Sequence, residues 1–161
     1  MGKFNNKIEA EFNPPRKWIL ARALSYQNEE MEESALQSIG IKCPASRITC
    51  KKGFVTDLAS VPRMIWNLIA PWDVARAAII HDFLYKSIRQ YRAKEDKPDN
   101  PEIETVTSNY KAAKEAADKV FLMAMKDSDP KVPSWKIYAA YTAVDLFGRW
   151  SIIPREDDDQ M

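Results

Sequence analysis

The apolar residues of this chain change their spacing part-way along the sequence, and that change limits the folds open to it. In the first fifty residues they alternate with polar residues, as in a half-buried strand, and after Pro62 they recur at helical spacing. Strands followed by helices favour a segregated α+β fold over an alternating α/β fold. We therefore predict an N-terminal antiparallel β-sheet built from hairpins, packed against a C-terminal bundle of about three to four α-helices.

Separate stretches of sequence carry the strand pattern and the helix pattern. The predicted strands are residues 8–12, 18–26 and 47–50. The predicted helices are residues 63–70, a long helix from an N-cap at Asp73 to about Gln90, 109–126 and 134–148.

Two further segments have few apolar residues to bury. Residues 91–108 are polar and contain two prolines, so we predict a long surface loop or insertion there. Residues 155–161 are acidic and are predicted to form a mobile tail. The rest of the chain, residues 1–154, is long enough for one core and too short for two, which predicts a single domain.

Composition excludes several classes of partner. The sequence holds 24 Lys and Arg against 23 Asp and Glu, a net charge of +1, so no global field favours nucleic acid or an anionic membrane. No apolar run reaches the roughly 20 residues of a membrane span, and the N-terminus lacks the apolar stretch of a signal peptide. We expect a protein of the cytoplasm, with Cys43 and Cys50 reduced and structural.

The junction between strands and helices is the first candidate site. It runs from Gly53 to Arg63 and contains Thr56, Asp57 and Ser60. Loops that join a sheet to helices often carry functional groups. The same three side chains are also good helix caps, which is the structural alternative.

A second candidate site lies on the long helix. Helical spacing places His81, the only histidine, on an apolar face, with Asp82 flanking that face and Tyr85 one turn later. A buried imidazole needs hydrogen-bond partners, so His81 is either a satisfied core residue or part of a site. Asp118 on the next helix is a further candidate, with a simple ion pair to Lys114 or Lys119 as its structural alternative.

Three carboxylates and one imidazole are a plausible ligand set for a divalent metal. We predict Asp57, His81, Asp82 and Asp118 as ligands of Mg, Mn or Zn, with Ser60 and Tyr85 as hydrogen-bonding groups. A bound metal would lower the pKa of water and support hydrolysis. The chain has only four glycines and no phosphate-binding glycine loop, so no nucleotide or organic cofactor is expected.

Three motifs of the sequence resemble a known family. They are GFVTDLASVPR from Gly53 to Arg63, AIIHDFLY from Ala78 to Tyr85, and ADKVF from Ala117 to Phe121. In them the chain is similar to the domain of unknown function 1353, a family encoded by tailed bacteriophages and prophages. The resemblance implies a viral gene product that stays in the host cytoplasm or enters the virion, and it supplies no reaction.

Two functional hypotheses follow. The first is a phage-encoded hydrolase with a metal held by the acidic residues and His81. The second is a tail, connector or assembly component that contacts other virion proteins, in which the same polar residues form a structural network and the abundant aromatic residues serve a core and a protein interface.

Overall fold

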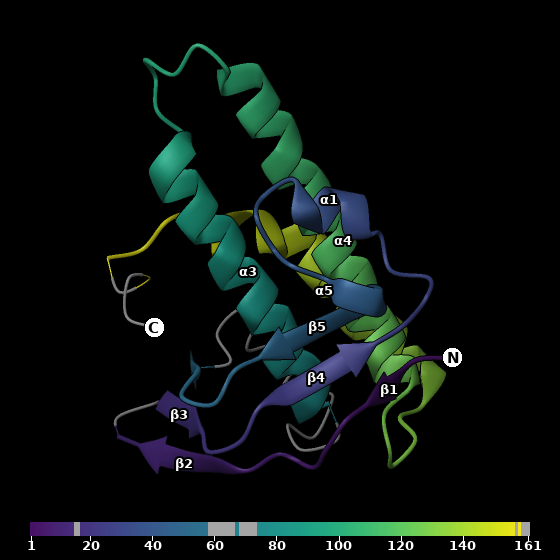
Figure 1. Cartoon of the computed structure of the whole chain (residues 1–161). Helices are drawn as coiled ribbons and strands as arrows, with labels where there is room; N and C mark the ends of the chain where they lie inside the picture. Colours follow the sequence, from purple (N-terminus) through teal and green to yellow (C-terminus); the bar gives the residue numbers. More distant parts are fainter. Residues whose placement is uncertain (15–16, 58–66, 68–73, 157, 159–161) are drawn as a thin grey trace.

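The chain folds as strands first and helices afterwards, with the helices stacked behind the strands (Figure 1). The computed structural model describes residues 1–14, 17–57, 67, 74–156 and 158. The predicted α+β class is confirmed by this arrangement. The helix predicted at residues 63–70, apart from residue 67, and the cap at Asp73 fall outside the described residues.

The strands form two small antiparallel sheets rather than one. The strands are β1 (Lys3–Phe4), β2 (Ala10–Asn13), β3 (Lys17–Leu20), β4 (Leu24–Gln27), β5 (Arg47–Cys50) and β6 (Val55–Thr56). One sheet has the order β1-β4-β5 and the other has the order β2-β3-β6. The predicted strand at residues 18–26 is therefore two strands, because the chain bends after Leu20 and passes from one sheet to the other while keeping its alternating pattern.

Three long helices supply most of the core. They are α3 (Ala75–Glu95), α4 (Ile103–Lys126) and α5 (Ser134–Ser151), and a short helix α1 (Glu33–Gln37) and a 3-10 turn (Pro44–Ser46) lie between β4 and β5. Helix α3 packs on both sheets and on α4, and α4 packs on α5 and α1. In Figure 1 α3 and α4 run side by side, with α5 behind them. No helix in the described ranges has the length and apolarity to cross a membrane.

Small residues on the facing sides of α3 and α4 let these two helices approach closely. Ala77 and Ala78 of α3 and Ala113 and Ala117 of α4 are fully buried. Close packing of this kind leaves little space, so any polar group at the helix contact must find its partner within the protein. Between these helices lies the only histidine of the chain.

The predicted loop at residues 91–108 is wrong in its extent. Residues 91–95 continue α3 and residues 103–108 begin α4, so only the connection between them is irregular. Polar residues dominate here because both helix ends project beyond the sheets and are largely solvated. Arg92 lies over the ring of Tyr110 at 4.2 Å, and Asn109 donates to the Tyr91 hydroxyl at 3.2 Å, so the two helix ends contact each other.

Both cysteines are reduced and buried, as predicted. Burial raises the pKa of Cys43 to about 11 and, together with the nearby charge of Asp82, raises the pKa of Cys50 well above its ordinary value. Neither thiol is therefore reactive at neutral pH.

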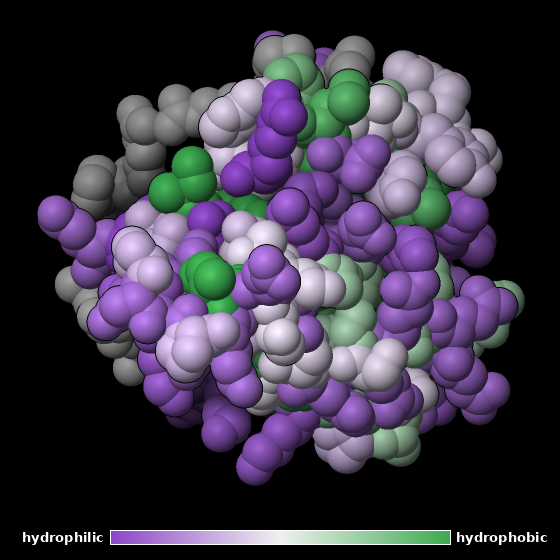
Figure 2. Space-filling view, turned by 90° about the horizontal axis from the view of Figure 1, so that it is seen from above, coloured by the Kyte–Doolittle hydropathy of each residue, from purple (hydrophilic) through white to green (hydrophobic). Residues whose placement is uncertain are grey.

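The surface in Figure 2 is mainly hydrophilic, with hydrophobic residues scattered among polar ones.

Candidate functional site

Four polar side chains meet between α3, α4 and α5, and we call them the Asp118 network: His81, Tyr85, Lys114 and Asp118. His81 Nε2 lies 2.9 Å from Asp118 Oδ1, and the Tyr85 hydroxyl donates to the same oxygen at 2.6 Å. Lys114 donates to Asp118 Oδ2 at 2.7 Å and to the main-chain oxygen of Asp145 on α5 at 3.1 Å. His81, Tyr85 and Asp118 are at most 1% exposed and Lys114 is 9% exposed, so the network is closed to solvent except at the edge where Lys114 lies.

Helical periodicity explains why these residues meet. His81 and Tyr85 stand one turn apart on α3, and Lys114 and Asp118 stand one turn apart on α4. The His81 ring packs against the rings of Tyr85 and Phe121, with centroids 4.1 and 4.7 Å away. The pairing of Asp118 with Lys114, which the sequence offered as a structural alternative, is present.

Hydrogen bonding decides the charge of Asp118. Burial alone would raise the pKa of Asp118, but hydrogen bonds from His81, Lys114 and Tyr85 outweigh burial and hold that pKa below its ordinary value. Burial and the neighbouring Asp118 charge raise the pKa of Tyr85, so Tyr85 remains a donor at neutral pH. The network is thus one buried carboxylate surrounded by donors.

One atom of the network lacks a partner. His81 Nδ1 is buried without a hydrogen-bond partner among the residues that the structure describes. An imidazole that carries its proton on Nε2 donates to Asp118 and leaves only a lone pair on Nδ1. An unpaired acceptor is tolerated more often than an unpaired N–H donor.

The contribution of Asp118 to stability is expected to depend on pH. Because the pKa of Asp118 is lower in the folded than in the unfolded chain, its contribution is complete above the ordinary value of 3.8 and is lost as the pH falls through the folded-state pKa. The difference in unfolding free energy between wild type and Asp118→Asn should shrink as the pH drops below 3.8. Urea titrations at a series of pH values measure this difference, and a difference that grows on acidification would contradict the prediction.

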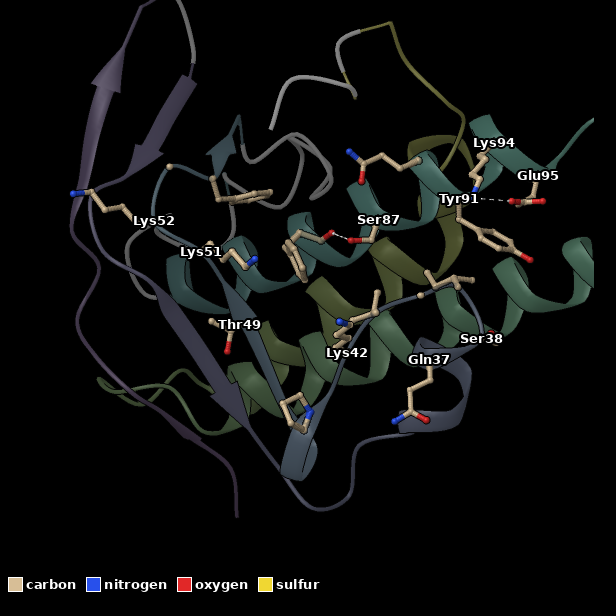
Figure 3. Close-up of a pocket in the computed structure, with 18 residues that line it drawn as sticks. Gln37, Ser38, Lys42, Thr49, Lys51, Lys52, Ser87, Tyr91, Lys94 and Glu95 are labelled. Carbon is tan, nitrogen blue, oxygen red and sulfur yellow. Dashed lines mark hydrogen bonds and ion pairs between the residues drawn. The ribbon is translucent and has the colours of Figure 1, made fainter.

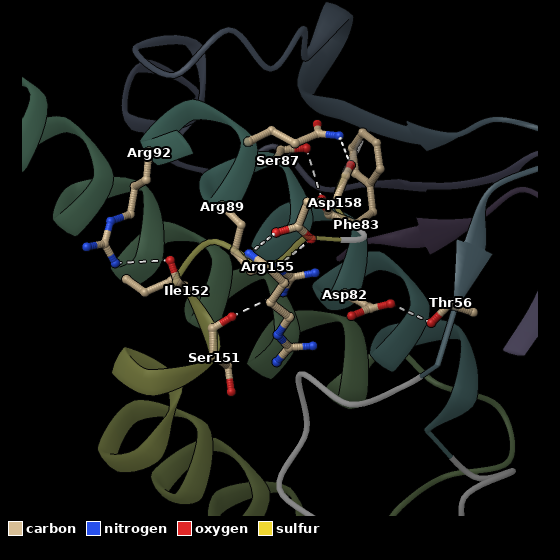
Figure 4. Close-up of polar contacts among 11 residues, drawn as sticks. Thr56, Asp82, Phe83, Ser87, Arg89, Arg92, Ser151, Ile152, Arg155 and Asp158 are labelled. Atoms are coloured by element: carbon tan, nitrogen blue, oxygen red, sulfur yellow. Dashed lines mark hydrogen bonds and ion pairs between the residues drawn. The ribbon is translucent and has the colours of Figure 1, made fainter. Parts of the chain in front are cut away.

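Asp57 and Asp82 lie in a different place, at a small charged opening between β6 and α3. Thr56 donates to Asp82 at 2.6 Å, which ties the strand to the helix (Figure 4). The opening has a volume of about 40 Å³, and the described residues that line it comprise Val55, three carboxylates and four cations: Lys17, Val55, Asp57, Asp82, Lys86, Arg89, Arg155 and Asp158. It is too small for a substrate, and its cations already balance its carboxylates.

The predicted metal ligands are therefore divided between two locations. His81 and Asp118 meet in the closed network with Tyr85, whereas Asp57 and Asp82 face the charged opening. Among the described residues, no three His, Cys, Asp or Glu side chains are arranged to hold a metal ion. Ser60 lies outside the described residues.

The acidic tail is anchored at one residue, which corrects the prediction of a mobile tail at that point. Asp158 is only 3% exposed and accepts from Arg89 Nε at 2.8 Å and from the main-chain nitrogen of Arg155 at 2.8 Å (Figure 4). Gln90 donates to the main-chain oxygen of Asp158 at 2.6 Å. Sequence reasoning missed this contact, because a buried Arg89 on α3 gives no local sign of a partner 69 positions away.

A wide hollow on the described surface also escaped the sequence analysis. It is an open groove of about 1130 Å³ between the turn after α1, the β5–β6 turn and α3. Four lysines line it, together with Glu95, which pairs with Lys94 at 3.4 Å; the lysines are Lys42, Lys51, Lys52 and Lys94 (Figure 3). From the sequence these lysines resemble ordinary solvated positions, because they come from three separate segments.

Together the two small sheets, the three long helices and the polar cluster between the helices define an α+β protein. A family model described as Protein of unknown function (DUF1353) matches residues 36–144. The chain belongs to this family, as its motifs predicted. No curated protein and no solved structure matches the chain.

Proposed function

We propose that the chain is encoded by a tailed phage or prophage and serves as a structural or assembly component of the particle. In this proposal the Asp118 network holds α3, α4 and α5 together and performs no chemistry. The observation that carries the proposal is the burial of His81, Tyr85 and Asp118, which are at most 1% exposed. A general base must come within hydrogen-bond reach of its substrate or of a water molecule, and His81 is 0% exposed.

The surface of α5 gives the proposal independent support. Six large apolar side chains expose more than two fifths of their area on or just beyond this helix: Trp135, Tyr138, Leu146, Phe147, Trp150 and Ile153. Apolar residues concentrated in this way are typical of a protein–protein contact surface. An assembly component needs a surface that contacts other proteins, whereas a hydrolase does not need one for its reaction.

A metal-assisted hydrolase is the second candidate, and one observation favours it. Asp57 and Asp82 face the same opening, so a Mg, Mn or Zn ion bound there would have two carboxylates within one site. The four cations of the same lining oppose this reading, because they disfavour a further positive charge. This electrostatic balance makes the assembly proposal the better supported of the two.

Replacing Asp82 by Asn separates the two candidates. An architectural Asp82 accepts a charge-assisted bond from Thr56, so Asp82→Asn should lower the free energy of unfolding by roughly 1 to 3 kcal/mol. Neither wild type nor variant should then respond to Mg, Mn or Zn. Thermal melts of both proteins with and without each ion measure the two effects together.

The opposite outcome would support the hydrolase. If Asp82 belongs to a metal site, carboxylate repulsion is relieved by the substitution, so apo stability is kept or raised and the metal-induced rise in Tm is lost. Asp145→Asn is a matched control, because the Asp145 side chain is 55% exposed and lies outside the opening.

A further inference from the structure

Helix α5 is apolar on two opposite faces. Its inner face packs on the core through Ile137, Ala140, Val144 and Gly148. The residues at intervening positions form what we call the outer face: Trp135, Tyr138, Thr142, Leu146, Trp150 and, just beyond the helix, Ile153. All six are exposed, at spacings of three or four residues, which places them in one stripe along the helix.

The outer face is nearly symmetric about Thr142. Tyr138 and Leu146 each lie four positions from Thr142, and Trp135 and Trp150 lie seven and eight positions from it. When a second copy lies antiparallel across this stripe, the large side chains of one copy therefore lie opposite large side chains of the other. We propose that the outer face of α5 binds a second copy of this chain in a two-fold symmetric, antiparallel helix pair centred on Thr142.

The pairing sets large side chains of one copy against large side chains of the other. It sets Tyr138 against Leu146 of the second copy and Trp135 against the end of the helix that carries Arg149 and Trp150. Arg149 already lies over the ring of Trp150 at 4.3 Å, so this guanidinium is placed to contact an aromatic face of the second copy. Isologous contacts of this kind close after two copies.

The surface area that this pairing would bury is also of the order found in protein–protein interfaces. Each aromatic side chain can bury roughly 200 Å², and the large residues of the stripe are about half exposed, so pairing would bury roughly 500 Å² per copy from these side chains alone. Neighbouring side chains add to this, and a standard interface buries about 800 Å² per partner. The self-matching order of the stripe is the reason to choose a second copy over a different protein.

The pairing rests on the proposed role of α5 as a contact surface, and its first test is the mass in solution. Wild type should sediment with twice the 18.5 kDa of one chain, and Leu146→Glu should sediment as a single chain because it buries a charge against Tyr138 of the second copy. Phe12→Glu is the matched control, since Phe12 is 53% exposed on β2 and should keep the double mass. Circular dichroism establishes that each variant is folded.

Disulfide trapping tests the geometry. Thr142→Cys should cross-link to itself on mild oxidation, because the two copies of residue 142 face each other at the symmetry axis. Ser134→Cys should not cross-link. Residue 134 lies eight residues, or roughly 12 Å, from the symmetry axis along each helix, so its two copies are roughly 24 Å apart. The native cysteines are buried and do not interfere.

Two outcomes would overturn the pairing: a wild type that stays a single chain across a dilution series, or cross-linking at residue 134 in preference to residue 142. Both leave the assembly proposal intact. That proposal fails instead if Asp82→Asn abolishes a metal response, so the two failures are distinguishable.

Discussion

We expect Asp118→Ala to lower the free energy of unfolding by about 3 to 5 kcal/mol, which is the usual cost of removing one partner from a buried ion pair. The substitution leaves the Lys114 ammonium, the Tyr85 hydroxyl and His81 Nε2 without their shared acceptor. His81 and Tyr85 are 0% exposed, so their polar atoms lose an acceptor that solvent at the folded surface does not replace. Chemical denaturation of wild type and variant measures the loss.

Asp145→Ala is the matched control for this prediction. Asp145 also faces Lys114, at 3.8 Å, but its side chain is 55% exposed, so the interaction is screened by water. We expect a change within about 0.5 kcal/mol. Equal losses in the two variants would mean that Asp118 is not the centre of the network.

The second large effect is expected at Gly148, where α5 passes close to Tyr85. A Cβ at position 148 would overlap the Tyr85 hydroxyl oxygen and lie 3.0 Å from Tyr85 Cζ and 3.2 Å from Lys114 Cε. Gly148→Ala must therefore displace the hydroxyl that donates to Asp118. Overpacking costs about 1 to 3 kcal/mol, and a weakened bond to a charged group adds about 2 kcal/mol. Alanine regains about 1 kcal/mol of helix propensity, so the net loss should be about 2 to 4 kcal/mol.

A double-mutant cycle tests the stated cause. Tyr85→Phe removes the overlapping oxygen, so Gly148→Ala should cost at least about 1 kcal/mol less in that background than in wild type. Additive losses would show that the glycine is needed for another reason. Urea denaturation of the four proteins gives the coupling energy directly.

The class of fold could be predicted because it depends on local periodicity. Alternation before Pro62 and helical spacing after it are properties of neighbouring residues, and both survive in the structure. The loop prediction failed at residues 91–108 because a solvated helix end and a loop have the same polar composition. Separating them requires the contact of Arg92 with Tyr110 across the two helices, which no single helix reveals.

The candidate site could be predicted only in part. The position of His81 on an apolar face followed from helical spacing, and its buried environment agrees with that reading. Its grouping with Asp118 rather than Asp57 could not be derived, because it depends on how α3 packs against α4. Asp82 is adjacent in sequence to His81, yet on a helix adjacent residues point about 100° apart, so the two side chains serve different locations.

The buried side chain of Tyr85 also bears on where this protein can be cut. Residues 36–144, the part shared with the family, start after β4 and end before Gly148, so a fragment with those limits would lack the strand that pairs with β5 and the helix turn that covers Tyr85. It would also lack Leu20, Leu24 and Tyr26, which are core residues at most 1% exposed. The cooperative unit is thus larger than the family signature, and recombinant work on relatives should retain the flanking segments.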